Sequence, residues 1–239
     1  MKLVFVCSGK GGAGKSCVCA YTAAAMAKTG KKTLLIDMGG VPGSLDLILG
    51  AQDYAVFNLG DVLKGDCEPE KAIVAVEGYK DLFLLPAGIP PRDKADKNSL
   101  DKVIEQVKGE YEFVFLDNPD FDALKPQPDD TILLVTTPDT LSVRAAAQKN
   151  LELFEAGIQG VRLVINHVPA RVIPMNSFHS FDDIIDTVAA QLIAVIPSSQ
   201  KLHHSANNGL PLSRESLTVK IFERAAGRLL NKPLPLLVR

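Results

Sequence analysis

One short segment near the amino end constrains the fold of this chain more than any other. Residues 9–16 read GKGGAGKS and satisfy the pattern G-x-x-x-x-G-K-[ST]. The apolar run 3–7 precedes the segment and favours a buried strand, and the alanine-rich run 16–28 follows it and favours a helix. In this context the loop N–H groups and the helix N-terminus converge on phosphate oxygens. The segment therefore predicts a phosphate-binding loop; the alternative is a glycine-rich turn without a ligand.

We expect a different role for each of three side chains in this loop. Lys15 can reach the β- and γ-phosphates of a nucleotide, and the Ser16 hydroxyl can ligate Mg²⁺. Lys10 is a second lysine, directly after the first glycine, and a mononucleotide site does not require it. The alternative for Lys10 is an ordinary solvated lysine on a loop.

The rest of the chain alternates between apolar, β-rich runs and helical patterns. The runs that predict strands are 2–7, 32–37, 82–85, 113–116, 131–136, 161–165 and 192–196. The patterns that predict helices lie near 15–29, 57–64, 99–108, 140–156, 182–189, 198–208 and 215–230. The strand runs are almost continuously apolar, as in parallel strands that are covered on both faces. The sequence therefore predicts the α/β class, with a doubly wound, mainly parallel sheet and helices on both faces.

Several polar residues fall where these strands end. Ligands of such sheets bind at the carboxyl ends of the strands, and Cys7, Asp37, Asp117 and Asn166 all lie at or near such ends. Asp117 follows four apolar residues, and a carboxylate at such a position needs a partner. In a phosphate-binding protein of this type the partner is Mg²⁺ with its waters, whereas the alternative is a turn before Pro119.

Composition sets limits on the class of protein. The chain has 239 residues, of which 46% are hydrophobic, so it can bury a large core. A formal charge of −2 gives no overall attraction to nucleic acid or anionic lipid, and DNA is not an expected partner. No apolar run reaches the roughly 20 residues of a membrane span. We expect no signal peptide, because the apolar start of the chain reads as a strand that leads directly into the loop. We expect a cytoplasmic protein, with any membrane contact peripheral at the inner membrane.

Cysteines and histidines are interpreted as structural or surface residues. The cysteines stand at 7, 17, 19 and 67 without a C-x-x-C pair, which favours small buried hydrophobes over a metal site. His203 and His204 are adjacent on a predicted helix and diverge, so we expect surface histidines. The charged run 92–94 fits a functional loop and a solvated surface equally well.

Lys10 brings in a resemblance to a known family. The loop resembles the deviant Walker A box, Lys-Gly-Gly-x-Gly-Lys-[Ser/Thr], of the MinD/ParA family. Further similar segments are Thr33–Asp37, the switch I region 44–50, the Walker B run Phe113–Asp117, and the C-terminal stretches 195–197 and 205–211. The run 84–88, continuing to 92–94, is similar to the MinD branch in particular.

The resemblance implies ATP and Mg²⁺ as cofactors and assigns residues to them. Catalysis would fall to Lys10 and Lys15, and the metal site to Ser16, Asp117 and Asp37. The nucleotide would contact Gly9, Lys10, Gly11, Gly12, Ala13, Gly14, Lys15, Ser16, Cys17, Asn166 and Pro197. Asn166 is placed like the adenine-contacting Asn of the family. Its amide offers both a donor and an acceptor, which suits the edge of a base. The alternatives for Asp37 and Asn166 are turn-forming residues.

The resemblance also implies a function and partners. It describes one P-loop ATPase domain over 1–239, a MinD-like, septum-site-determining or related spatial-regulation ATPase that acts as a nucleotide-gated switch. In this family ATP joins two copies into a homodimer, and Lys10 would reach the nucleotide of the other copy. A regulatory protein of unknown identity would be the further partner. Two alternatives remain, namely a ParA-type partition ATPase that binds DNA non-specifically and a largely non-hydrolysing, ATP-bound scaffold.

Two departures from the family pattern concern hydrolysis. Gly39 stands where the family usually has a second acidic residue after the second strand, and Phe121 stands where the Pro-x-Gly after Walker B has glycine. We therefore expect a slow ATPase, converting ATP to ADP and phosphate.

The C-terminal tail departs from the family as well. MinD ends in an amphipathic membrane helix, whereas residues 231–239 read NKPLPLLVR and place Pro235 inside any such helix. We expect a tail packed on its own domain and weak or absent membrane attachment.

Overall fold

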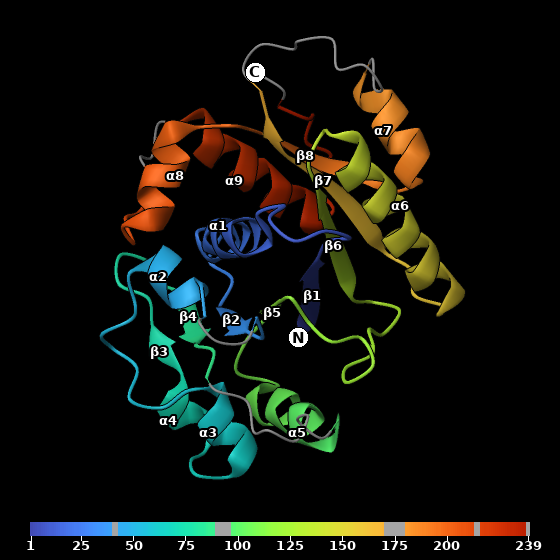
Figure 1. Ribbon diagram of the computed structural model, residues 1–239. Coiled ribbons are helices and arrows are strands. Elements are labelled where there is room, and N and C mark those ends of the chain that lie inside the picture. The colour runs from blue at the N-terminus through green and yellow to red at the C-terminus, as the bar shows by residue number, and fades with distance from the viewer. Residues whose placement is uncertain (40–42, 89–96, 170–179, 213–215, 238–239) are drawn as a thin grey trace.

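An eight-stranded sheet runs through the middle of the molecule (Figure 1). The structure is a computed structural model that describes residues 1–39, 43–88, 97–169, 180–212 and 216–237. The strand order is β3-β4-β2-β5-β1-β6-β7-β8, and β3 pairs antiparallel with β4 while the pairings from β4 to β8 are parallel. The strands are β1 (Lys2–Cys7), β2 (Thr33–Asp37), β3 (Val74–Ala75), β4 (Leu82–Leu85), β5 (Phe113–Asp117), β6 (Thr131–Thr136), β7 (Val161–Val168) and β8 (Gln191–Pro197).

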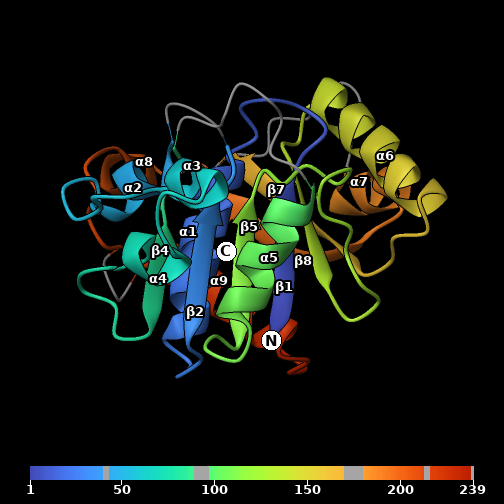
Figure 2. The same cartoon turned by 90° about the horizontal axis from the view of Figure 1, so that it is seen from below.

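Helices cover both faces of this sheet (Figures 1 and 2). One face packs against α1 (Lys15–Ala27), α2 (Leu45–Leu49), α8 (Gln200–Asn207) and α9 (Leu217–Leu229). The other packs against α3 (Leu59–Lys64), α4 (Pro69–Ala72), α5 (Lys97–Val107), α6 (Thr140–Glu155) and α7 (Phe181–Val188).

The two faces explain why the strands are apolar throughout. Successive side chains of a strand point to opposite faces, and in β5 Phe113 and Phe115 enter one core cluster while Val114 and Leu116 enter the other. Burial on both sides leaves no solvated face that would need polar residues. The predicted fold class is thereby confirmed.

Some elements differ from the sequence expectation. The strand β3 and the helices α2 and α4 are not predicted, because elements of two to five residues show no periodicity. The strand β7 extends beyond 165 to Val168, with His167 at a φ of 55° and a register shift between Ile165 and Val168. The helix expected over 57–64 begins at Leu59, because Asn58 and Asp61 form a capping box.

The central strands bring two carboxylates together. Asp37 ends β2 and lies in register with Asp117 at the end of β5, and Val6 of β1 is aligned with Asp117 on its other side. The loop from β1 to α1 leaves the sheet at this same carboxyl edge, the upper edge in Figure 2. The fold therefore gathers the phosphate-binding loop and both carboxylates at one place.

The tail lies against its own domain as far as Leu237, as expected. The guanidinium groups of Arg224 and Arg228 donate to the carbonyls of Pro235 (2.9 Å) and Leu234 (3.3 Å). A Cβ on Gly227 would lie 2.5 Å from Leu234 Cδ1, so the Leu234 side chain packs closely on α9 at this glycine. Leu236 and Leu237 pack against the two core clusters.

Candidate nucleotide-binding site

The loop between β1 and α1 has the geometry of a phosphate-binding loop. Gly12 and Gly14 have φ angles of 80° and 85°, in the left-handed region that favours glycine. A Cβ on Gly9 would lie 2.1 Å from the Ala145 carbonyl oxygen, so the loop lies directly on the backbone of α6. Substitution at either Gly9 or Gly14 would displace the loop.

The N-terminus of α1 is available for an anion. Its N-cap is Gly14, and among the described residues no side chain caps the first turn and no acidic residue lies in it. The first N–H groups of a helix need partners and carry a partial positive charge. Lys15 begins the helix, and Gly11 and Gly12 are exposed, so a phosphate group can approach the loop from solvent.

Asp117 is a buried carboxylate without a hydrogen bond. Its relative exposure is 0%, and neither carboxylate oxygen has a hydrogen-bond partner among the described residues. Burial raises the pKa of Asp117 from 3.8 to about 6; the nearby Ser16 hydroxyl lowers it, Asp37 raises it and Lys15 lowers it. A buried, unpartnered carboxylate beside a serine and a lysine fits a Mg²⁺ site. Asp117 and Ser16 could hold the ion through its water shell.

Asp37, unlike Asp117, accepts hydrogen bonds from backbone N–H groups. Its Oδ1 accepts the N–H of Gly39 (2.9 Å), and its Oδ2 accepts the N–H groups of Ser44 (2.9 Å) and Leu45 (3.0 Å). The carboxylate thus holds both ends of the segment after β2 and the start of α2. Asp37 forms the turn that the sequence left as its alternative, and its metal contact stays a prediction.

Asn166 forms a hydrogen bond to the phosphate-binding loop. Its Nδ2 donates to the Ala13 carbonyl (2.9 Å), while its buried Oδ1 has no partner among the described residues. The amide therefore has its donor on the loop and its acceptor available for a ligand donor, such as the exocyclic amine of adenine. Pro197, which ends β8, is in register with Val168 at the same edge, and adenine contact by Asn166 and Pro197 stays a prediction.

His167 is a site neighbour that the sequence analysis missed. Its Nε2 would lie 3.2 Å from a Cβ on Gly14, and its ring stacks on His203 of α8, with centroids 5.4 Å apart and planes at 3°. Burial and the second imidazole lower the pKa of His167. His203 is exposed, as expected, but the contact between β7 and α8 has no signal in the sequence because the two residues are remote along the chain.

Burial keeps the thiols near the loop protonated. Burial raises the pKa values of Cys7 and Cys17 to about 12, and Lys149 and Lys15 only partly offset this effect at Cys7. Burial, with the two carboxylates of Asp117 and Asp37, also raises the pKa of Cys19 well above its usual range. These residues pack as small hydrophobes, as predicted, and Cys17 would contact a nucleotide only through its position in the first turn of α1.

The two departures from the family pattern have structural consequences. Gly39 is exposed and donates its N–H to Asp37. The Phe121 ring stacks on Phe5, with centroids 5.7 Å apart, and the Lys149 ammonium lies 5.2 Å from the Phe121 centroid. Phe121 is therefore half-buried and packs against the core. The charged run 92–94 lies outside the described residues.

Lys10 lies at the mouth of the loop. Its side chain is 48% exposed, and its ammonium is 3.9 Å from Asp139 Oδ1. Partial burial opposes ionisation of Asp139, but hydrogen bonds from Thr137 and Ser142, together with Lys10, lower its pKa to about 2. An exposed pair at this distance adds little stability, so Lys10 is free to move toward another anion.

The buried charge of Asp117 leads to a prediction about pH. The unfolded carboxyl ionises near 3.8 and the folded one near 6. The folded state therefore binds the proton more tightly, and ligand-free stability should increase as the pH falls from about 7 to about 4. The contribution is on the order of 3 kcal/mol. Asp117→Asn should raise the ligand-free melting temperature at neutral pH and remove this pH dependence, as measured by thermal unfolding.

Asp37→Asn is the matched control for this experiment. Asp37 is also buried, but its carboxylate accepts three backbone N–H groups, so the amide should lower stability. A ligand-free Asp117→Asn protein that unfolds at a lower temperature than the parent at neutral pH would contradict the assignment.

Comparison with known proteins agrees with this geometry. The model of the family described as "CobQ/CobB/MinD/ParA nucleotide binding domain" matches residues 4–212. The septum site-determining protein MinD of Synechocystis is 33% identical over 247 aligned positions, covering 99% of this chain and 92% of the relative. The MinC:MinD cell division protein complex of Aquifex aeolicus contains a chain with a TM-score of 0.89 and 31% identity, with 100% of this chain and 99% of that chain covered.

A further solved structure includes a nucleotide. The septum site-determining protein MinD of Pyrococcus horikoshii, complexed with Mg-ADP, has a TM-score of 0.80 and 26% identity, with 95% of each chain covered.

Proposed function

The chain belongs to the CobQ/CobB/MinD/ParA nucleotide-binding family, and on this basis we propose that it is a MinD-like ATPase whose ATP·Mg²⁺-bound form acts as a molecular switch. The observation that carries the proposal is the uncapped N-terminus of α1 beside the unpartnered carboxylate of Asp117. The first offers N–H donors to phosphate oxygens, and the second offers a metal ligand. A single ATPase domain over 1–239 is part of this proposal.

The loop 9–16, Asp117 and Asn166 each have a role in the proposal. Mg²⁺ would neutralise charge on the phosphates when bound. The loop 9–16 binds the phosphates through its N–H groups, Lys15 places an ammonium against the terminal phosphates, and Ser16 with Asp117 orients the ion. Asn166 braces the loop through Ala13 and presents its free oxygen to the base.

Dimerisation would depend on Lys10. The ammonium of Lys10 lies at the exposed mouth of the loop. Among the described residues it forms one ion pair, at 3.9 Å to Asp139, which it can exchange for a phosphate. Two copies that face each other across these loops would each contribute a lysine to the phosphates of the other. Nucleotide binding then neutralises the like charges that oppose a two-fold interface.

This arrangement predicts that ATP drives dimerisation and that Lys10 is specific to that step. In analytical ultracentrifugation the parent should double its mass with ATP and return to the monomer with ADP. Lys10→Ala should bind ATP but remain monomeric. Lys31→Ala is the matched control. Lys31 also forms an exposed ion pair, at 2.6 Å to Glu112, but it lies outside the loop 9–16. A Lys10→Ala protein that dimerises normally would refute the role of Lys10.

Regulation by another protein is the second part of the proposal. The Aquifex relative is a MinC:MinD complex. By similarity, we propose a regulatory protein partner that recognises the nucleotide-bound state.

The tail leads to a prediction about membranes. The described helices include none that is long and apolar enough to cross a bilayer. The tail contacts α9 through Arg224, Arg228 and Gly227, and its described leucines are already half-buried. We expect little sedimentation with anionic liposomes, with or without ATP. Strong ATP-dependent sedimentation that is lost on deletion of 231–239 would contradict this prediction.

A further inference from the structure

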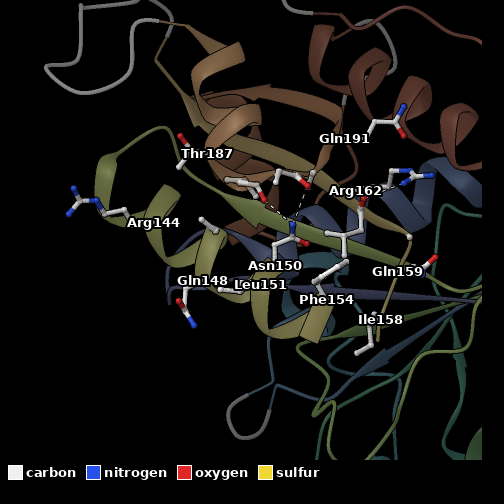
Figure 3. Close-up of a pocket in the computed structure, with 16 residues that line it drawn as sticks. Arg144, Gln148, Asn150, Leu151, Phe154, Ile158, Gln159, Arg162, Thr187 and Gln191 are labelled. Carbon is white, nitrogen blue, oxygen red and sulfur yellow. Dashed lines mark hydrogen bonds between the residues drawn. The ribbon is translucent and has the colours of Figure 1, made fainter. Parts of the chain in front are cut away.

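A groove lies between α6, α7 and the amino ends of β7 and β8 (Figure 3). Its volume is about 790 Å³. Leu151, Phe154 and Ile158 provide an apolar lining, and the Phe154 side chain is 70% exposed. Large apolar side chains that line an exposed groove are typical of interaction sites.

The walls of this groove are fixed. Asn150 of α6 donates its Nδ2 to the carbonyls of Val188 (2.8 Å) and Ala189 (3.2 Å), which end α7 (Figure 3). These bonds join the two helices and satisfy carbonyls that the helix itself cannot pair. The groove is therefore already formed without a ligand.

A second hollow continues the groove toward the tail. It has a volume of about 260 Å³ and shares Arg162 and Gln191 with the first hollow. Arg228 and Lys232 line its far part. We call the two adjoining hollows the basic groove.

The charge of the basic groove differs from that of the whole chain. Arg144, Arg162, Arg228 and Lys232 line it, whereas no Asp or Glu is among its described lining residues. The whole chain has a formal charge of −2. Four cations in a chain that is acidic overall form a local positive field that would attract an anionic partner.

Carboxylates do not neutralise these cations within the described part of the chain. Arg162 donates to the Val161 carbonyl (3.2 Å), and Arg228 donates to the carbonyls of Leu192 (3.0 Å) and Leu234 (3.3 Å). Backbone carbonyls hold the guanidinium groups in place but leave their net charge uncompensated. Arg144 and Arg162 lie on opposite sides of the first hollow in Figure 3. A partner that spans the hollow can meet one cation at each side.

We propose that the basic groove is a docking site for an acidic peptide segment of a protein partner, with an aromatic or aliphatic anchor flanked by carboxylates. The anchor would pack on Leu151, Phe154 and Ile158, and the carboxylates would pair with Arg144 and Arg162. The apolar lining and the concave shape favour a peptide over nucleic acid or a flat lipid surface.

Most of the groove lies away from the nucleotide site; Arg144 is the exception, because its neighbour Ala145 lies against Gly9 of the loop. The groove opens at the amino ends of β7 and β8, whereas the loop 9–16 and Asp117 lie at the carboxyl edge of the sheet. A bound segment would leave the nucleotide site uncovered. The proposal can therefore fail or succeed separately from the proposed ATPase function, and it is tested without nucleotide.

The test uses a dye-labelled peptide of about 12 residues with Glu at both ends and Phe and Leu at helical spacing in its centre. Fluorescence polarisation measures its affinity for the full chain and for Arg144→Glu/Arg162→Glu. We expect the double variant to bind at least about tenfold more weakly and to gain affinity for the same peptide with Lys in place of Glu. Phe154→Ala should also weaken binding, and it should not disturb the fold because Phe154 is exposed.

The matched control is Lys201→Glu/Lys220→Glu, which makes the same charge change at exposed positions of α8 and α9 outside the groove. It should retain the affinity of the parent. Equal binding by parent and Arg144→Glu/Arg162→Glu would overturn the proposal. So would a groove that binds duplex DNA or anionic vesicles but not the peptide, or one that joins two copies of this chain, seen as a mass increase that Phe154→Asp abolishes.

Discussion

Replacing Lys15 with alanine is expected to reduce ATP affinity at least about 100-fold, because the variant loses hydrogen bonds to charged phosphates that contribute about 1.5–3 kcal/mol each. Lys15 begins α1 and is partly buried, and its charge lowers the pKa values of Cys7 and Asp117. The positive charge of Lys15 therefore acts at the carboxyl edge of the sheet, where terminal phosphates and Mg²⁺ would be. Isothermal titration calorimetry of ATP with Mg²⁺ measures the loss directly.

The control for this measurement is a lysine at the opposite end of α1. Lys28 follows α1 and forms an exposed ion pair with Glu223 at 3.5 Å, so Lys28→Ala removes the same charge without touching the loop. Lys28→Ala should bind ATP like the parent. If Lys15→Ala did so too, the assignment of a phosphate-binding loop, and every proposal built on it, would be wrong.

The sequence predicts the loop and the central sheet well because their signals are local. The motif, the apolar strand before it and the helix after it are continuous in the chain, and their geometry follows from glycine conformations and helix polarity. The sequence also indicates the environment of Asp117, because a carboxylate that follows four buried residues has few hydrogen-bond partners available. In the structure this carboxylate has no hydrogen-bond partner among the described residues, and its contact with Mg²⁺ stays a prediction.

The tertiary partners could not be predicted in the same way. Asp37 holds N–H groups seven and eight residues away, and their approach depends on how the segment after β2 folds. Asn166 meets Ala13, and His167 meets His203, only because strand order places β7 and α8 beside the loop. In the sequence, Phe121 stands where the family pattern has a glycine. Only the structure shows that its ring packs on Phe5.

Hydrolysis depends on the two departures from the family pattern. In-line attack on the γ-phosphate requires a positioned water, and the sequence offers no carboxylate at Gly39 to orient it. Asp46 and Asp120 could replace it, but both accept backbone N–H groups in their own turns, from Leu47 (2.8 Å) and Asp122 (2.9 Å). The Phe121 ring is fixed between Phe5 and Lys149, so this position cannot relax as a glycine would. These contacts favour a slow ATPase with a long-lived ATP-bound state.

Gly39→Asp is therefore expected to accelerate single-turnover ATP hydrolysis by about 10²-fold or more, the usual contribution of a positioned general base or water-orienting group. The substitution should be tolerated, because Gly39 is exposed and does not have the positive φ that only glycine favours. A Cβ at this position would lie 3.1 Å from Asp37 Oδ1, which requires only a small adjustment. Gly39→Asn is the matched control, since it adds the same bulk without the carboxylate and should leave the rate unchanged. A parent that already turns over near ~1 s⁻¹ or faster, with no gain in Gly39→Asp, would show that this chain positions its water by other residues.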